Sequence, residues 1–307
     1  MNIQKIKKSR IYIFLRHTKL YICGILFKYK LRKKNFSIKV MSHENTIFYV
    51  KENKISLIRF GDGEINLIAG NDLSAGYQNY NKELADKLIT IWNECGKKYL
   101  LCLSDIFDDL SKYRRLTRAF YYYHLYKQGY VYEQYCKKEY IYGNTFVTRP
   151  YYIYLKKNDA GKRFELVKSL WEEKNIVLVE GQFSRQGVGN DLFEKARSVK
   201  RIICPAQNAY DSIKKIEQSI IQYVKKDEIV LISLGPTAKV IIYDLVKYGY
   251  WLIDIGHIDS EYEWFRRGAK KKISIENKHT AECNDEDIDM TFLDVAYQKQ
   301  IIARIGC

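Results

Sequence analysis

The stretch Glu228–Gly256, EIVLISLGPTAKVIIYDLVKYGYWLIDIG, decides the fold of this chain. Two apolar runs, residues 228–235 and 250–256, flank a helical pattern over residues 237–249. Strands that are apolar at every position are typical of parallel sheets, because helices cover both faces of such a sheet. A strand, a helix and a second strand in this order therefore predict a right-handed parallel crossover.

The same alternation extends over most of the chain. Further strands are predicted at residues 56–61, 98–104, 175–181 and 201–206, and further helices at residues 81–97 and 210–226. Together they predict an α/β fold with an open, doubly wound and mostly parallel sheet. Residues 107–160 are rich in tyrosine and predict a helix followed by an extended or irregular segment. This insertion either shapes a cleft whose aromatic rings suit sugars and peptides, or reflects ordinary helical packing.

The chain of 307 residues is long enough for one large domain with its own core. We expect a basic arm over residues 1–43, the main domain over residues 44–275 and a C-terminal extension over residues 276–307. The extension begins acidic and ends in a helix-like pattern over residues 291–305.

Charge is concentrated in the arm. The net charge is +16, and residues 1–43 contain 12 Lys or Arg and no Asp or Glu, so the rest of the chain carries only +4. A nucleic-acid partner is not expected, because such proteins more often spread cations over the folded face that meets phosphates. The longest apolar run of the arm, Leu20–Phe27, has eight residues and is too short to span a bilayer, which takes about 20. The arm is either a helix lying on an anionic membrane surface or an ordinary helix packed on the body.

The seven cysteines form no C-x-x-C pair, and some have apolar neighbours, as in LLCLS and RIICPA. They indicate buried thiols in a reducing compartment, which favours a cytoplasmic protein that is peripheral at the inner face of the membrane if the arm binds lipid.

Polar motifs follow several predicted strands, at the sheet edge where doubly wound folds bind ligands. Gly235, Pro236 and Thr237 form a strand-to-helix turn that suits an anion, although a plain capped turn has the same pattern. A loop with three glycines follows the strand at residues 175–181, and its glycines and arginine suit a phosphate. Its candidate binding residues are Glu180, Ser184, Arg185, Asn190 and Asp191.

Acidic groups follow two other strands. In GHIDSEYEW, the residues His257, Asp259 and Glu261 could hold a metal or supply a general base. In RFGDGE, Asp62 and Glu64 offer the oxygen ligands that Mg²⁺ or Mn²⁺ prefers, and Arg59 is placed to position the turn or a phosphate.

With these motifs assembled, the chain resembles the GT-D-type glycosyltransferases, a family first defined as a domain of unknown function. The resemblance rests on RFGDGE, EGQFSRQGVGNDLF, RIICPAQNAYD, LGPTAKVIIYDL and DIGHIDSEYEWF, and it covers roughly residues 45–265. It implies a Rossmann-like nucleotide-sugar-binding core and metal-dependent transfer of a sugar, with glucose expected, from a UDP-sugar. The implied acceptor is a glycan or glycoprotein in bacterial surface glycan assembly or adhesin glycosylation.

The D-x-E motif of the family corresponds to Asp62 and Glu64, which the resemblance assigns to the metal, Mn²⁺ or Mg²⁺. A second D-x-E, Asp259–Glu261, leaves that assignment open to exchange. The base for the acceptor hydroxyl is expected among His257, Asp259 and Glu261. The donor is expected to contact Arg59, Glu180, Ser184, Arg185, Asn190, Asp191, Gly235, Pro236 and Thr237.

Two other functions fit the same pattern. The first is another nucleotide-dependent transferase, of phosphate or methyl groups, because one fold hosts many reactions. The second is a scaffold that binds a membrane or nucleic acid through the basic arm.

Overall fold

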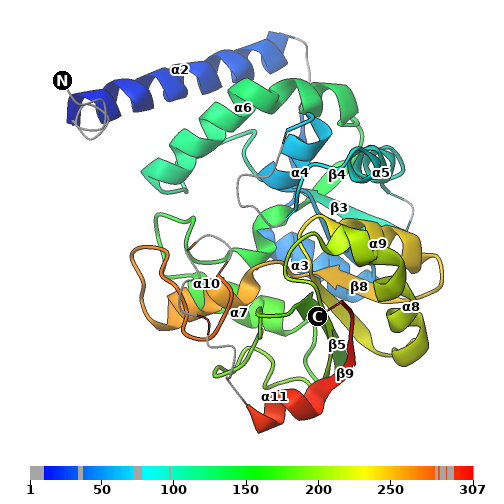
Figure 1. The fold of residues 1–307 in the computed structure, drawn as a ribbon. Helices are drawn as coiled ribbons and strands as arrows, with labels where there is room; N and C mark the ends of the chain where they lie inside the picture. Colours follow the sequence, from blue (N-terminus) through cyan, green and yellow to red (C-terminus); the bar gives the residue numbers. More distant parts are fainter. Residues whose placement is uncertain are drawn as a thin grey trace.

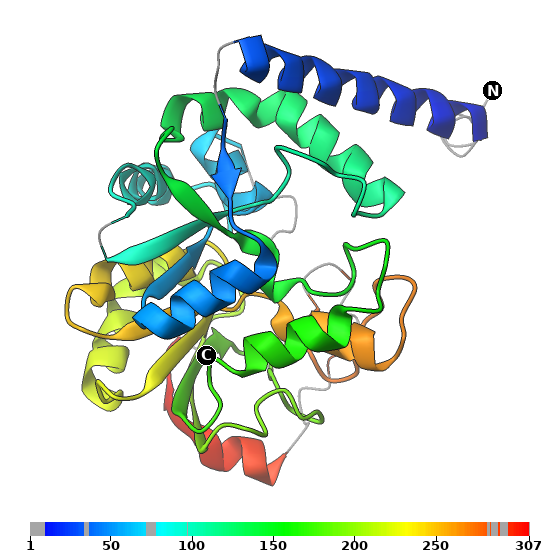
Figure 2. The same ribbon diagram turned by 180° about the vertical axis from the view of Figure 1, so that it is seen from behind.

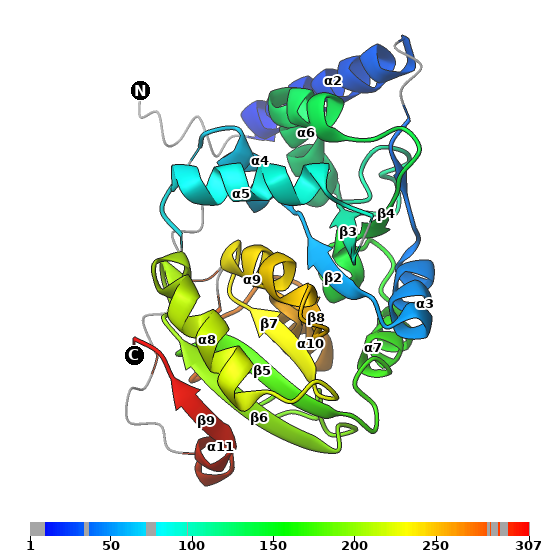
Figure 3. The same cartoon turned by 90° about the vertical axis from the view of Figure 1, so that its right-hand side faces the viewer.

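The computed structural model describes residues 10–33, 37–71, 78–96, 98–280, 283, 288 and 294–306. Its centre is a nine-stranded sheet in which every pairing is parallel, with helices on both faces (Figure 1 and Figure 3). This architecture confirms the predicted α/β class. The strand order is β1-β4-β3-β2-β8-β7-β5-β6-β9. The strands are β1 (Lys39–Val40), β2 (Ser56–Arg59), β3 (Tyr99–Leu103), β4 (Ile141–Asn144), β5 (Asn175–Gly181), β6 (Ser198–Cys204), β7 (Ile229–Ser233), β8 (Trp251–Asp254) and β9 (Ile301–Arg304).

The helices connect these strands and flank the sheet. They are α2 (Arg10–Lys33), α3 (His43–Asn53), α4 (Asp62–Ile68), α5 (Lys82–Asn93), α6 (Arg115–Tyr135), α7 (Ala160–Lys168), α8 (Ile213–Tyr223), α9 (Thr237–Val246), α10 (Ile258–Arg266) and α11 (Val295–Gln300), with 3₁₀ turns η1 (Thr145–Thr148) and η2 (Ala209–Ser212).

All six strands expected from apolar runs are present, and β1, β4 and β9 are additional. β1 has two residues, and β4 reads IYGN, so neither presents an apolar run. The helix-like pattern over residues 291–305 was only partly right. Within it, α11 ends at Gln300 and the chain continues directly into β9, which pairs with β6 at the sheet edge.

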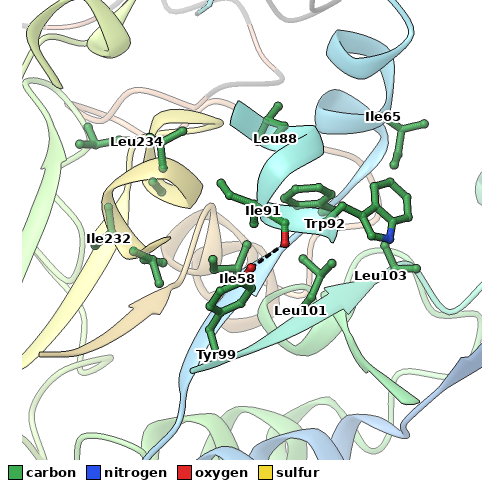
Figure 4. Close-up of a cluster of buried hydrophobic side chains, with 14 of the residues drawn as sticks. Ile58, Ile65, Leu88, Ile91, Trp92, Tyr99, Leu101, Leu103, Ile232 and Leu234 are labelled. Atoms are coloured by element: carbon green, nitrogen blue, oxygen red, sulfur yellow. Dashed lines mark hydrogen bonds between the residues drawn. The ribbon is translucent and has the colours of Figure 1, made fainter. Parts of the chain in front are cut away.

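Each central strand divides its side chains between two cores, one on each face of the sheet. On β7, Val230 and Ile232 pack under α5, α8 and α9, whereas Ile229 and Leu231 pack under α3, α7 and α10. Burying one such side chain fully contributes about 1.5–3 kcal/mol. Figure 4 shows the first core, in which the Tyr99 hydroxyl donates a 2.5 Å hydrogen bond to the carbonyl of Ile91 on α5. The alternation explains why these strands read as continuously apolar.

The order of the strands fixes where a ligand can bind. From β2 the chain runs outward to β3 and β4, and later it returns through β7 and β8 to the other side of β2. The strand ends at this change of direction leave a crevice, because the connecting segments diverge to either side. The ends of β2, β7 and β8 are where the predicted motifs lie.

Helix α2 lies along α6, outside the layers that cover the sheet (Figure 1 and Figure 2). Two glycines let the helices approach closely. A Cβ atom at Gly24 would lie 1.9 Å from the ring of Tyr122 on α6, and one at Gly129 of α6 would lie 2.0 Å from the ring of Phe27. Across the described ranges, no helix combines the length and apolarity needed to cross a bilayer.

The cysteines follow the sequence expectation as far as they are described. Cys23, Cys95, Cys102, Cys136 and Cys204 are buried, Cys283 is half-buried, and no disulfide joins any of these six. Cys307 lies outside the described residues.

Candidate active site

A cleft of about 840 Å³ opens along the carboxyl ends of β2, β5, β7 and β8. Some of the predicted site residues line it and others do not. Those on its wall are Arg59, Asp62, Glu64, Ser184, Gly235, Pro236, His257 and Asp259. Those that the structure does not bring to this wall are Glu180, Arg185, Asn190, Asp191, Thr237 and Glu261.

Arg59 ends β2 and joins it to β8. Its Nη2 lies 2.7 Å from Oδ1 of Asp254, and its Nε donates to the Asp254 carbonyl at 2.8 Å. Gly256 makes room for this guanidinium: its φ is +46°, and a Cβ there would lie 2.0 Å from Arg59 Nη2. Arg59 therefore ties the end of β2 to β8 at the wall of the cleft, and its predicted contact with a phosphate stays a prediction.

Lys239 is the centre of the charge network, and the sequence reasoning missed it. It lies in the first turn of α9, and its Nζ is 2.9 Å from Glu64 Oε1, 2.9 Å from Asp254 Oδ2 and 2.9 Å from the Gly235 carbonyl. Three acceptors match the three N–H groups of an ammonium, which stabilises a buried charge. The signal was a lysine inside the otherwise apolar run AKVII, residues 238–242.

This network controls the ionisation of Asp254. Burial alone raises the pKa of its carboxyl, but Arg59 and Lys239 outweigh that effect and hold the pKa below its ordinary value. Asp254 is therefore charged at neutral pH and binds the ends of β2, β8 and α9 together.

Asp62 and Glu64 are the first and third residues of α4, directly after β2. Glu64 Oε2 accepts a 2.8 Å hydrogen bond from the amide of Gly61, so this side chain also caps its own helix. Within the described part of the chain, no cluster of three or more His, Cys, Asp or Glu is arranged for a metal. Asp62 and Glu64 nevertheless line the same cleft, and a divalent ion is often held by one or two carboxylates plus substrate phosphates. Asp62 and Glu64 are the two carboxylates that would hold such an ion beside a diphosphate.

The second D-x-E pair is built into the protein. Asp259 Oδ1 accepts 2.8 Å hydrogen bonds from the Gly187 amide and Asn190 Nδ2, and its Oδ2 lies 2.8 Å from Lys278 Nζ. Glu261 is fully buried, and its Oε2 accepts from the amides of Tyr151 and Tyr152 at 3.2 and 2.8 Å. Both carboxylates of this pair are therefore held by donors of the protein itself.

The loop with three glycines folds onto the protein. Arg185, with a φ of +43°, is buried and donates to the Asn277 carbonyl at 2.7 Å. Asn190 bridges Asp259 and Glu263, and Asp191 accepts from the Tyr262 hydroxyl at 2.9 Å. These contacts fasten the loop to α10. Only Ser184 of the predicted loop residues reaches the cleft.

Glu180 at the end of β5 is also structural. It is fully buried and lies 2.5 Å from Arg201 Nη1, and its other oxygen accepts from the Gln186 amide. Burial raises the pKa of Glu180 even though Arg201 opposes the shift.

The turn before α9 supplies backbone to the cleft. Gly235 has a φ of +52°, which a non-glycine residue rarely adopts, and Pro236 immediately precedes the helix. Thr237 is fully buried, so its side chain supports the turn from inside. The start of α9 therefore presents the positive end of a ten-residue helix next to Gly235 and Pro236.

The other side of the cleft carries cations and aromatic rings that the motifs did not indicate. Arg149 lies beside His257, with Nη2 and Nδ1 3.4 Å apart, and Lys272 lies 5.3 Å from the ring of Tyr152. Leu116 and Phe120, both exposed, extend this wall along α6. Most of these residues belong to the tyrosine-rich segment 107–160, for which a role in shaping a cleft was one of the two expectations, and Lys272 lies in the loop after α10.

A parallel sheet with a polar cleft at its change of strand direction is typical of α/β proteins that bind their ligand at this edge of the sheet. Residues 57–283 match the family model described as "Glycosyltransferase GT-D fold". The chain belongs to this family.

Two curated relatives come from streptococci. The chain is 44% identical over 271 residues to "Probable glycosyl transferase Gly" of Streptococcus gordonii, which covers 88% of this chain and 39% of that protein. It is 42% identical over 283 residues to "Glycosyltransferase GlyD" of Streptococcus pneumoniae, covering 92% of this chain and 34% of the relative. The chain thus spans between a third and two fifths of the length of these proteins.

Solved structures share the whole fold. One, described as "The highly conserved domain of unknown function 1792 has a distinct glycosyltransferase fold", is 40% identical with a TM-score of 0.85, covering 94% of this chain and 100% of its own. Another, "A New Glycosyltransferase (DUF1792) from Streptococcus sanguinis", is 42% identical with a TM-score of 0.84, covering 88% of this chain and 100% of its own.

Proposed function

We propose that this chain transfers a hexose, glucose being the first candidate, from a UDP-sugar to a glycan or glycoprotein of the bacterial surface, such as an adhesin. The observation that carries the proposal is the cleft at the carboxyl ends of β2, β7 and β8, where Asp62 and Glu64 lie close to Gly235 and Lys239 in a member of a glycosyltransferase family. Carboxylates, a buried ammonium and a helix start together suit a diphosphate and its counter-ion.

The donor is assigned to the end of the cleft formed by β5, β6 and β7. Gly181, Ala206 and Gly235 line this end with little side-chain bulk, so a ligand can lie against the backbone. The start of α9 favours the negative charge of a diphosphate there. Asp62 and Glu64 would hold Mn²⁺ or Mg²⁺, which supplies positive charge to the nucleotide diphosphate as it leaves. Lys239 fixes the Glu64 carboxylate in place.

The acceptor is assigned to the opposite end, between α6 and the segment after β4. Phe120 and Tyr152 offer ring faces on which a sugar can stack, and Arg149 and Lys272 stand beside them. Of the three candidate bases, Glu261 is buried away from the cleft, and both oxygens of Asp259 already accept hydrogen bonds. His257, at the cleft and at the start of α10, is the group that we assign to the acceptor hydroxyl.

The decisive experiment is a donor screen that measures nucleotide release with and without Mn²⁺. We expect release from a UDP-sugar, strongest with UDP-glucose, that falls on chelation of the metal and is lost in Asp62→Asn. Thermal-shift binding of UDP, ATP and S-adenosylmethionine to the same preparation separates sugar transfer from phosphate or methyl transfer. Stabilisation by ATP or S-adenosylmethionine, with none by UDP, would contradict the proposal.

A further inference from the structure

Helix α2 exposes a row of large apolar side chains that the fold does not use. Phe14, Leu15, Ile22, Ile25 and Leu26, which we call the apolar stripe, are each between 46 and 61% exposed. At about 100° per residue, the five positions fall within an arc of roughly 120° on one side of the helix. Exposed apolar residues scattered singly are ordinary, whereas a contiguous row of this kind marks a contact surface.

The other side of α2 is already in use. Cys23 and Phe27 are buried, and Gly24 receives the ring of Tyr122 from α6. These positions lie opposite the apolar stripe on the helix, so the contact with α6 leaves the stripe facing outward. In Figure 1 and Figure 2, α2 lies at the periphery of the molecule with its far side turned away from the body. Because α2 carries apolar side chains on two opposite sides, it shows little overall amphipathicity.

Charge indicates what covers the stripe. Within α2 there are seven Lys or Arg and no Asp or Glu, and the first acidic residue of the whole chain is Glu44. Lys19 is exposed at the margin of the stripe. A second copy of the chain would bring two strongly cationic helices together, which costs free energy. An anionic bilayer surface offers apolar depth and opposite charge at once.

We propose that α2 lies flat on an anionic lipid surface, with the apolar stripe at the boundary between headgroups and acyl chains. The helix has 24 residues and is therefore about 36 Å long, ample for an interfacial helix. The inference needs no assumption about the reaction in the cleft, since α2 precedes the matched family region, residues 57–283. Both expectations for the arm then hold, because one side of α2 packs on α6 and the opposite side meets lipid.

The test is vesicle sedimentation with the full chain. We expect binding to vesicles containing phosphatidylglycerol to exceed binding to pure phosphatidylcholine vesicles at least about tenfold, and to weaken as salt is raised. The double variant Ile22→Asp/Ile25→Asp should lose at least about tenfold in affinity for the anionic vesicles. The matched control is Ile221→Asp/Tyr223→Asp on α8, whose side chains are 52 and 42% exposed, and it should bind like the unaltered chain.

Circular dichroism and the melting temperature check that both double variants fold. Equal binding to neutral and anionic vesicles would overturn the electrostatic part of the proposal. Unchanged anionic binding in Ile22→Asp/Ile25→Asp would overturn the role of the stripe. Light scattering without lipid gives the remaining outcome: a dimer that the stripe variant breaks would assign the surface to a second copy and refute the lipid assignment.

Discussion

The two Asp-x-Glu pairs have identical spacing and different surroundings. Asp62 and Glu64 are the first and third residues of α4, and both line the cleft. Asp259 and Glu261 stand one position further into α10, where one carboxylate turns to the glycine loop and the other to the backbone of residues 151–152. Both side chains of the first pair line the cleft, whereas both carboxylates of the second pair fasten neighbouring segments of the chain.

A short acidic motif therefore has no fixed structural role, since its surroundings decide whether it lines a cleft or fastens loops. Glu64 combines both roles, because one oxygen caps α4 and the other meets Lys239 at the cleft wall. Three substitutions test this difference and a fourth examines the other end of the cleft, and their expected effects decrease in the order given.

Asp62→Asn should affect activity most. Loss of this half-buried carboxylate should reduce sugar transfer about 1000-fold, equivalent to about 4 kcal/mol of activation free energy, because nucleotide release loses its charge stabilisation. The melting temperature should stay close to that of the unaltered chain. Asp227→Asn, at an exposed position, is the control. Wild-type turnover in Asp62→Asn would remove the distinction between the two pairs.

Lys239→Met should reduce the free energy of unfolding by about 3 kcal/mol, because Glu64 and Asp254 would lose their shared cation. The control is Lys215→Met on the exposed face of α8. Urea denaturation measures both.

The same variant has a pH signature. Since Arg59 and Lys239 hold the pKa of Asp254 below its ordinary value, this carboxylate stabilises the fold above that ordinary value, near pH 4. The stabilisation disappears as the pH falls toward the lowered pKa. Without Lys239 the pKa of Asp254 rises toward its ordinary value, so the variant should lose less stability than the unaltered protein as the pH falls below that value. Identical acid transitions in the two proteins would refute this account.

Glu261→Ala should cost about 2 kcal/mol of stability, because the amides of Tyr151 and Tyr152 lose their buried acceptor. Turnover per folded molecule should change less than about twofold, since the carboxylate does not touch the cleft. Glu194→Ala, at an exposed position, is the control for a carboxylate removed from the surface. Abolished turnover in a fully stable Glu261→Ala protein would show that the second pair is catalytic.

Phe120→Ala has the smallest expected effect and examines the acceptor end of the cleft. The KM for a glycan acceptor should rise about fivefold, equivalent to about 1 kcal/mol, because a stacking face is lost. Donor hydrolysis without acceptor should not change. Tyr126→Ala, on the same helix but outside the cleft lining, should leave both quantities unaltered. An equal rise in the KM for the UDP-sugar would move the donor to this end.

The sequence predicted the fold well where burial on both faces imposes apolar runs, as in β2, β3, β5, β6, β7 and β8. It predicted β9 poorly, because IIAR continues the pattern of α11 and only pairing with β6 makes it a strand. In the site, strand-end positions located Asp62, Gly235 and His257 correctly on the cleft. Lys239 stands in the same motif as Gly235 but was not singled out, whereas Arg149 and Phe120 come from the tyrosine-rich segment and reach the cleft only through tertiary packing.

The contact between α2 and α6, in which each helix places an aromatic ring against a glycine of the other, also fixes the position of the cleft relative to α2. Tyr122 and Gly129 of α6 hold α2, while Leu116 and Phe120 of the same helix form part of the cleft wall. The single helix α6 therefore runs from the contact with α2 to the wall of the cleft. With α2 on a lipid surface, α6 would set the distance between that surface and the cleft that an acceptor has to enter.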